Sequence, residues 1–226
     1  MIIFVVGTDT GIGKTYATGL LAWGALKAGL KVITQKPVQT GSHVPEDLLV
    51  HRELMGLPED PPSLLKLTNP YLFSYPAAPA TAAEREGREV SLLRLKKTLA
   101  QLEDLYDLVF VEGAGGLYVP FTPRETFLDL LSLILAPVVV VSPARLGTIN
   151  HTVLTIEALK RRSLWILGLV YNHHFLHDEF LAAKSLDEIK KLTGLDNILT
   201  MPSLRGQPPE DLLPQVQQFL APLLPL

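Results

Sequence analysis

The sequence predicts an α/β fold, a three-layer sandwich in which helices cover both faces of a mostly parallel β-sheet. Short apolar runs alternate with longer segments of helical pattern along the 226 residues, which is typical of repeated βαβ units. Several runs are almost continuously apolar, as expected for strands that are covered on both faces. A glycine-rich segment that ends in Gly13-Lys14-Thr15 follows the first run. This order indicates a phosphate-binding loop between a strand and a helix.

Six apolar runs are expected to form strands, and six longer segments are expected to form helices. The strands are residues 2–6, 31–35, 108–112, 138–142, 164–171 and 197–201. The helices are residues 14–28, 46–55, 91–103, 150–161, 179–192 and 209–220. Ser91 and Asn150 carry the short polar side chains that favour the N-cap position. Gly29 follows the first helix, where glycine commonly ends a helix.

Residues 56–80 depart from this alternation because they contain six prolines. Prolines at this density predict neither a regular helix nor a central strand. We expect a long ordered excursion over one edge of the sheet, or a lid. A domain linker is the alternative, but Tyr71, Phe73 and Tyr75 make the segment too apolar for one. The chain shows no internal repeat and is expected to form a single domain over residues 1–226.

The composition narrows the classes of function. Hydrophobic residues make up 47% of the chain and charged residues 19%, which is typical of a compact globular protein. The net charge of -3 argues against a nucleic-acid partner, and the absence of cysteine excludes thiolate chemistry. No signal peptide is evident, and the longest apolar stretch, residues 128–141, is interrupted by Asp129, Ser132 and Pro137. We therefore expect a cytoplasmic protein with no membrane partner.

The glycine-rich loop predicts binding of a nucleoside triphosphate. Lys14 can reach the terminal phosphates, and the Thr15 hydroxyl can bind Mg²⁺. The strict pattern places a glycine where Thr8 stands, and the glycine of this chain comes one residue earlier. Asp9 is unusual because a carboxylate repels phosphate. It is expected to serve a metal, a cationic substrate or the backbone of the loop itself.

Polar residues follow the next two strands, at the edge where parallel sheets bind ligands. Lys36 precedes Pro37, which disfavours a helical conformation and directs the lysine off the strand end. Glu112 ends the third strand before Gly-Ala-Gly-Gly at residues 113–116. A carboxylate at this place is the expected acidic partner of a phosphate loop, holding Mg²⁺ directly or through water. Asp47 is a candidate for a further Mg²⁺ ligand.

The later strands end in segments that suit an organic ligand. Residues 144–151 open a helix whose N–H groups can bind a carboxylate. Asn172 can read a base edge, and residues 201–204 can pack on an adenine ring. Three histidines at residues 173–177 suggest a metal site, but the glutamate of a zinc protease helix is missing, so a solvated loop or helix start is favoured. No G-x-S-x-G nucleophile motif occurs.

Four motifs together resemble the dethiobiotin synthetase family, in order and at matching distances. They are residues 7–15, 36–41, 111–116 and 146–151. The resemblance implies a P-loop NTPase-type sandwich with about seven strands and a homodimer whose substrate site lies near the subunit interface. It also implies a ligase of biotin biosynthesis that closes the ureido ring of dethiobiotin from 7,8-diaminopelargonic acid (DAPA), CO₂ or bicarbonate, and ATP. The expected cofactor is Mg²⁺.

The resemblance also implies a role for individual residues. Lys36 and Lys14 would be catalytic, and Thr15, Asp47 and Glu112 would bind the metal. The residues expected at the substrate are Thr10, Lys36, Thr40, Gly147 and Asn150, the last two acting on the DAPA carboxylate of the neighbouring subunit. The residues expected at ATP are Gly11, Ile12, Gly13, Lys14, Thr15, Tyr16, Asp47, Glu112, Gly113, Ala114, Gly115, Asn172, His173, Pro202, Ser203 and Leu204.

Two other functions remain as alternatives. The first is a partitioning or nitrogenase-type ATPase of the same fold, which would act as a switch. Those proteins carry a signature lysine where this chain has Asp9. The second is a nucleotide-binding interaction module without chemistry, in which Lys36 and Glu112 would be needless.

Overall fold

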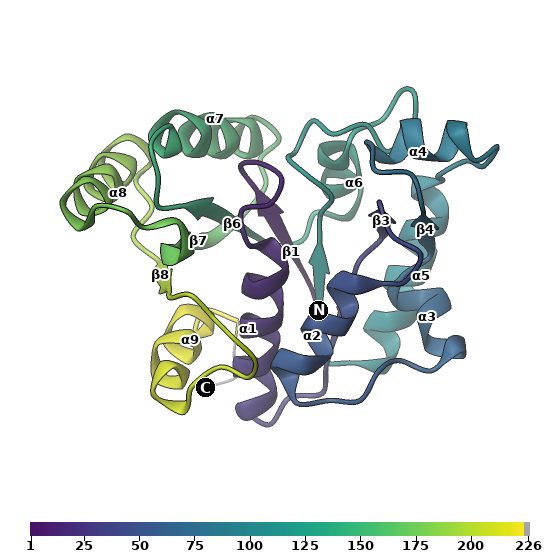
Figure 1. The fold of residues 1–226 in the computed structure, drawn as a ribbon, viewed down its shortest axis with the longest axis horizontal. Coiled ribbons are helices and arrows are strands. Elements are labelled where there is room, and N and C mark those ends of the chain that lie inside the picture. The colour runs from purple at the N-terminus through teal and green to yellow at the C-terminus, as the bar shows by residue number, and fades with distance from the viewer. Residues whose placement is uncertain (224–226) are drawn as a thin grey trace.

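The computed structural model describes residues 1–223 and has the predicted three-layer α/β architecture (Figure 1). Its main sheet has six strands in the order β2-β5-β1-β6-β7-β8, and every strand pair described is parallel. The strands are β1 (Ile2–Gly7), β2 (Val32–Gln35), β5 (Leu108–Glu112), β6 (Val138–Pro143), β7 (Ile166–Asn172) and β8 (Ile198–Met201). All six predicted strands therefore form.

The sheet was expected to have about seven strands, and the structure divides its strands differently. The short strands β3 (Val38–Thr40) and β4 (Tyr71–Phe73) pair with each other in a separate two-stranded sheet. The fold class is confirmed, with six strands in the main sheet and two beside it.

Helices cover both faces of the main sheet because neighbouring strand residues point to opposite sides. In β1, Ile3 and Val5 belong to one buried cluster, and Phe4 and Val6 belong to the other. The first cluster is closed by α1 (Lys14–Lys27), α2 (Glu46–Met55), η2 (Glu210–Leu212) and α9 (Leu213–Leu220). The second is closed mainly by α5 (Leu92–Leu105), α6 (Phe127–Ile134), α7 (Thr148–Arg161) and α8 (Glu179–Thr193).

The helix ends test the predicted caps. Ser91 is the N-cap of α5, and its side chain accepts the N–H of Arg94 at 3.3 Å. The prediction for Asn150 is wrong, because α7 begins two residues earlier, after Gly147 in the left-handed conformation (φ 87°). Gly29 follows α1 with a φ of 85°, as expected for a residue that ends a helix.

The proline-rich segment contains regular structure that the sequence did not predict. Helix α3 (Pro62–Thr68) lies inside it, and α4 (Pro79–Arg85) begins at its end. Both helices have a proline in the first turn, where the missing N–H breaks no helical bond. The segment runs along the edge strand β2, because the N–H of Lys36 donates to the Thr68 carbonyl at 2.8 Å. The predicted excursion over one edge is therefore confirmed, and the prediction that the segment contains no regular helix is wrong.

The long apolar stretch of residues 128–141 divides between α6 and β6. Thr126 caps α6, and its N–H and hydroxyl both donate to the Asp129 carboxylate at 2.8 Å. Within residues 1–223, no helix is both long enough and apolar enough to cross a membrane.

Candidate active site

The phosphate-binding loop joins β1 to α1 and has a conformation that only glycine tolerates at its last turn. Gly13 has a φ of 94°, and a Cβ there would overlap the Asn172 amide. Lys14 is 5% exposed, and its ammonium lies back over the loop and donates to the carbonyl of Asp9 at 2.7 Å. The loop is thus shaped to present backbone N–H groups and one lysine to an anion.

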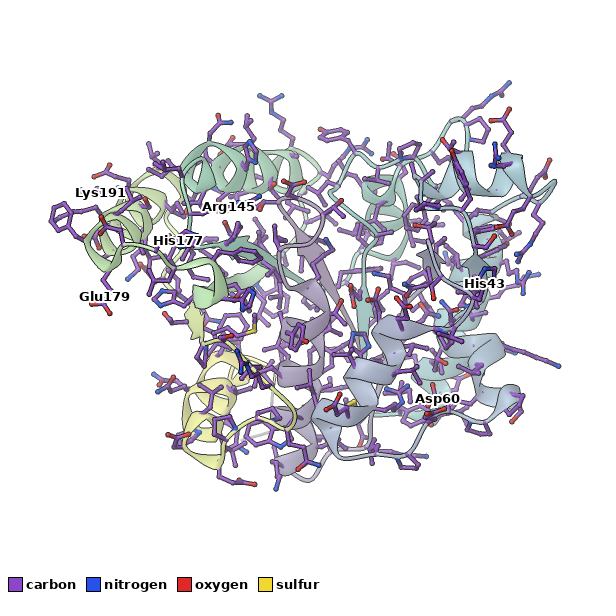
Figure 2. The ribbon with its side chains drawn as sticks, viewed as in Figure 1. His43, Asp60, Arg145, His177, Glu179 and Lys191 are labelled. Atoms are coloured by element: carbon purple, nitrogen blue, oxygen red, sulfur yellow. The ribbon has the colours of Figure 1, made fainter. Side chains whose placement is uncertain are left out.

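Asp9 serves the backbone of its own loop, one of the three roles expected for it. Its carboxylate accepts the N–H of Thr10 at 2.7 Å. Arg145, labelled in Figure 2 in the turn before α7, donates to the same carboxylate at 3.3 Å. The charge of Asp9 is therefore balanced by an arginine from a neighbouring strand end.

Four of the predicted residues meet at the carboxyl ends of β1, β2 and β5. The Lys36 ammonium lies 2.7 Å from Asp47 Oδ2 and 2.7 Å from Glu112 Oε1. The Thr15 hydroxyl lies 3.0 Å from Asp47 Oδ1 and 3.1 Å from Glu112 Oε1. Lys36 also donates to the carbonyl of Gly113 at 3.1 Å. A cation, two carboxylates and a hydroxyl therefore form one connected group.

The electrostatics of this group follow from burial opposed by charge pairing. Burial works to raise the pKa of Glu112, but the Lys36 ammonium and hydrogen bonds from His51 and Lys36 outweigh it and lower the pKa to about 2. Burial likewise works to lower the pKa of Lys36, and the two carboxylates beside it raise that pKa above its usual value. Lys36 and Glu112 are therefore charged at neutral pH. Burial, with repulsion from Lys36, lowers the pKa of Lys14 to about 8.

The oxygen atoms of Thr15, Asp47 and Glu112 fit a hard divalent cation. The Thr15 hydroxyl lies within 3.1 Å of an oxygen of each carboxylate, and Mg²⁺ prefers oxygen ligands. No group of three His, Cys, Asp or Glu that could hold a metal occurs among the residues the structure describes. The remaining ligands would thus be water and phosphate oxygens, which is the usual manner in which Mg²⁺ is bound with nucleotides.

We call the cavity over this group the reaction pocket. It measures about 230 Å³. It is lined by Thr10, Gly11, Ile12, Gly13, Lys14, Thr15, Lys36, Val38, Gln39, Thr40, Asp47, Glu112, Ala114 and Gly115. A second cavity of about 470 Å³, the side pocket, shares Thr10 and Thr40 with it and continues along residues 76–79. The predicted substrate residues Thr10, Thr40 and Lys36 therefore lie where the two cavities meet or in the reaction pocket itself.

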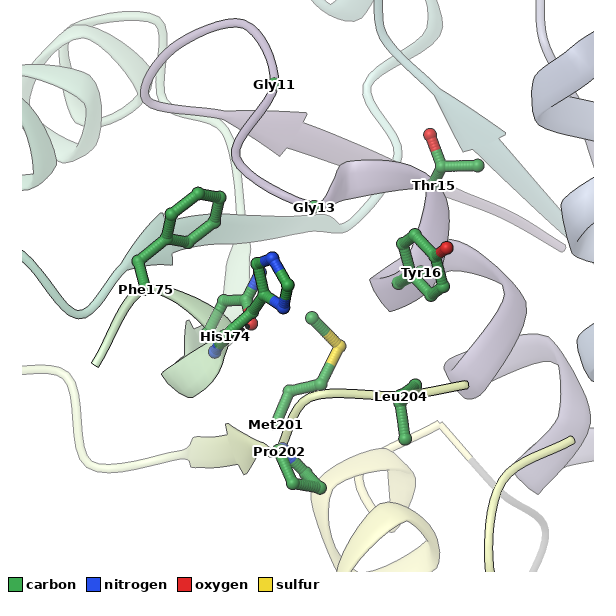
Figure 3. Close-up of a pocket in the computed structure, with 10 residues that line it drawn as sticks. Gly11, Gly13, Thr15, Tyr16, His174, Phe175, Met201, Pro202 and Leu204 are labelled. Atoms are coloured by element: carbon green, nitrogen blue, oxygen red, sulfur yellow. Dashed lines mark hydrogen bonds between the residues drawn. The ribbon is translucent and has the colours of Figure 1, made fainter. Parts of the chain in front are cut away.

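A third cavity, the base pocket, opens on the other side of the loop and measures about 360 Å³ (Figure 3). Its wall is largely apolar. It is lined by Gly11, Gly13, Thr15, Tyr16, Asn172, His174, Phe175, Met201, Pro202 and Leu204. Figure 3 shows His174 and Phe175 facing the cavity from η1 (His173–Phe175), with Met201 and Pro202 below them. The cavity suits a flat, partly apolar ring.

Two of the residues expected at ATP, His173 and Ser203, do not line this cavity. His173 packs edge-on against Tyr171, and the pocket wall is formed by His174, the next residue along. Ser203 does not line the cavity itself, but its hydroxyl lies 2.9 Å from His174 Nδ1 and orients that ring. The short 3-10 helix η1 begins directly after Asn172, which confirms the helix start expected there as the alternative to a loop, and His174 and Phe175 of this helix line the pocket.

Asn172 lines the base pocket, and its side chain also holds the phosphate loop. Its amide N–H₂ donates to the carbonyl of Ile12 at 2.9 Å, and its oxygen accepts the N–H of His174 at 2.9 Å. The side chain is 2% exposed and thus ties β7 to the phosphate loop. This clasp positions the loop beside the base pocket.

Gly147 and Asn150 lie at the start of α7, outside the residues that line these three cavities. The Asn150 side chain is exposed. Within one chain the structure therefore does not bring them to the reaction pocket.

Sequence reasoning missed three residues of the site. His174 and Phe175 belong to a short His-His-Phe segment. Which of these side chains face the pocket depends on the turn after β7, and no sequence pattern indicates it. His51 is fully buried and lies 2.8 Å from Glu112 Oε2. Its position on α2, four residues after Asp47, was a signal, since residues four apart share a helix face.

Comparisons with known proteins show which sequences this chain resembles. A family model described as an AAA domain matches residues 2–209. The ATP-dependent dethiobiotin synthetase BioD of Chlorobaculum tepidum is 45% identical over 83% of this chain and 79% of its own length. The BioD 2 protein of Haemophilus influenzae, also called ATP-dependent dethiobiotin synthetase, is 42% identical over 81% of this chain and 96% of its own length.

Solved structures support the fold. The MinD cell division protein of Aquifex aeolicus has a TM-score of 0.59 at 16% identity, covering 100% of this chain and 98% of its own. A ParA family ATPase from Chlorobium tepidum has a TM-score of 0.56 at 14% identity, covering 98% of this chain and 91% of its own. At this identity the likeness concerns the fold alone.

Proposed function

Because the chain belongs to the family of ATP-dependent dethiobiotin synthetases, we propose that it is a ligase that forms the two C–N bonds of the dethiobiotin ureido ring. Its substrates are DAPA, CO₂ and ATP, and its other products are ADP and phosphate. The observation that carries the proposal is the charged group of Lys36, Asp47, Glu112 and Thr15 at the junction of the phosphate loop and the side pocket.

The nucleotide would lie across the loop. Its base would occupy the base pocket between Phe175 and Met201, and its phosphates would bind the N–H groups of residues 11–15 with Lys14. Thr15, Asp47 and Glu112 would hold Mg²⁺, which supplies positive charge to the phosphates when bound. Of the residues expected at ATP, all but Gly113, His173 and Ser203 line one of these two cavities.

Lys36 would act on the carbamate that forms when a DAPA amine adds to CO₂. Its ammonium stays protonated at neutral pH and can neutralise the carbamate and the phosphoryl group that it receives from ATP. The second amine then attacks the carbonyl carbon of the mixed anhydride and displaces phosphate, which closes the ring. Catalysis in this scheme comes from placement and charge, as in other phosphoryl transfers.

DAPA would extend from Thr10 and Thr40 into the side pocket, whose wall of small and proline residues suits an aliphatic chain. Its carboxylate would be bound by the helix start at Gly147 and Asn150 of a second subunit. The proposal thus includes a cytoplasmic homodimer of single-domain chains, with neither nucleic acid nor membrane as a partner. Light scattering coupled to gel filtration tests the dimer, because a monomer would leave that carboxylate without its proposed ligands.

A phosphate-release assay tests the reaction. Purified protein with ATP and Mg²⁺ is expected to release phosphate only when DAPA and bicarbonate are both present, and mass spectrometry is expected to detect dethiobiotin in equal amount. The same phosphate release without DAPA would contradict the ligase and favour a nucleotide switch.

A further inference from the structure

A buried chain of hydrogen bonds connects the proline-rich segment to the reaction pocket. It starts at Asp60, in the segment between α2 and α3 (Figure 2). Both oxygens of this carboxylate accept from Arg52, Oδ1 from Nε and Oδ2 from Nη2, each at 2.7 Å. Thr68 of α3 donates to Oδ2 at 2.8 Å. The Arg52 and Asp60 side chains are 3% and 4% exposed. The pair is therefore buried, and its two parallel hydrogen bonds fix the orientation of both groups.

The next link passes through Thr34 on β2. Arg52 Nη1 lies 2.6 Å from the Thr34 hydroxyl oxygen, and arginine can only donate. The hydroxyl hydrogen of Thr34 is therefore free to point to His51 Nδ1, which lies 3.0 Å away. Because Nδ1 then accepts, the ring hydrogen is on Nε2.

This arrangement gives His51 one task. Its Nε2–H donates to Glu112 Oε2 at 2.8 Å, so that oxygen is occupied. The other oxygen of Glu112, Oε1, accepts hydrogen bonds from Thr15 and Lys36. The carboxylate is thus held in one rotation, with a single oxygen presented to the reaction pocket.

The geometry points to His51 as a positioning residue that fixes the orientation of Glu112 for metal binding, at the end of a relay that Asp60 begins. The inference rests on the proposed role of Glu112 as a metal ligand. Residues that hold a ligand in place commonly change metal affinity about 10- to 100-fold when they are removed. The proline-rich segment gains a function, since it fixes the first member of the relay.

Two variants of His51 separate positioning from packing. His51→Gln places an amide N–H near the position of Nε2 and can still reach Glu112. His51→Asn is shorter, and its amide can reach only the position of Nδ1, so the contact with Thr34 is kept and the contact with Glu112 is lost. Both replacements are polar and smaller than histidine.

The measurement is the binding of Mn²⁺, as a probe of the Mg²⁺ site, to the full chain with ADP, by calorimetry or electron paramagnetic resonance. We expect His51→Asn to weaken Mn²⁺ binding about 10- to 100-fold and His51→Gln to recover most of it. ADP binding without metal should be unchanged in both. Equal Mn²⁺ affinity in the two variants, whether normal or weakened, would overturn the inference.

Thr34→Val keeps the shape of the threonine and removes the hydroxyl that Arg52 and His51 share. Its Mn²⁺ affinity is expected to lie between those of the wild type and His51→Asn. Wild-type Mn²⁺ affinity in Thr34→Val would overturn the part of the relay that runs from Asp60 to His51. If His51→Asn fails to fold, this variant and His51→Gln still test the relay.

The titration contains neither DAPA nor bicarbonate, so it does not depend on ring closure. A failed phosphate-release assay beside the expected difference between the His51 variants would contradict the proposed reaction alone. The opposite pair of results would contradict the positioning role alone.

Discussion

The reaction pocket and the base pocket meet at the start of α1, yet their walls are built in opposite ways. In the reaction pocket, the Lys36 and Glu112 side chains are 7% and 2% exposed, and Glu112 bonds to both Lys36 and Thr15. In the base pocket, the wall is largely apolar, and Tyr16 is 40% exposed. The difference separates two tasks. The reaction pocket fixes charges before the substrate arrives, which favours catalysis, and the base pocket offers contact area, which favours binding.

The largest expected effect comes from breaking the charged group. Lys36→Ala is expected to lower kcat about 100- to 1000-fold, because a positive charge placed at the reacting groups is lost. The affinity for ATP should change little, since the nucleotide mainly contacts the loop. Stopped-flow turnover and calorimetric ATP binding measure the two quantities. Lys27→Ala, a change in an exposed ion pair with Glu210, is the control and should leave both unchanged.

An equal loss of ATP binding in Lys36→Ala would contradict the division between a pocket for catalysis and a pocket for nucleotide binding. It would place Lys36 in the nucleotide site alone.

The next effect tests the hydroxyl at the junction of the two pockets. Thr15→Ala is expected to raise the Mg²⁺ concentration for half-maximal activity about tenfold, because one oxygen ligand is removed. Thr15→Ser keeps the hydroxyl and should stay close to the wild type. A Mg²⁺ titration of phosphate release makes the measurement. Indistinguishable curves for the two variants would remove Thr15 from the metal site.

A smaller effect is expected in the base pocket. Phe175→Ala should raise KM for ATP about three- to tenfold, because roughly 1 kcal/mol of apolar contact is lost, with kcat nearly unchanged. Phe180→Ala on α8 is the matched control, since that ring is 73% exposed. Steady-state kinetics with varied ATP separate the constants. A fall in kcat at constant KM would mean that this wall also takes part in chemistry.

The smallest kinetic effect is expected at the cap of α6, whose residues line neither pocket. Asp129 accepts from Thr126, which lowers its pKa below the usual value of 3.8. A carboxyl whose pKa is lowered in the folded state stabilises the protein above its unfolded pKa, and the contribution is lost as the pH falls below that value. Asp129→Ala should therefore cost about 1 kcal/mol of the free energy of unfolding at pH 7 and less near pH 3.

Urea unfolding at the two pH values makes this measurement, with kcat and KM as the control. Changed kinetics in Asp129→Ala would show that stability and the pockets are coupled.

Part of the site was readable from the sequence because its residues stand at fixed places in local patterns. Lys36 and Glu112 follow apolar strands, and Thr15 belongs to the loop motif. Parallel strands bring these ends to one edge of the sheet. The orientation of His174 could not be predicted, because neighbouring residues in a short turn point in different directions and the hydrogen bond with Ser203 selects one of them.

The sequence by itself determined the six main strands, the phosphate loop and the residue types at the strand ends. These features depend on local periodicity and on backbone conformations that only certain residues adopt. Only the tertiary structure decided that β3 and β4 pair apart from the main sheet and that Asn172 clasps the loop. It alone joined His51 to Glu112, 61 residues further along the chain. Such contacts depend on distances between elements that no local pattern contains, so they become fixed only when the layers pack.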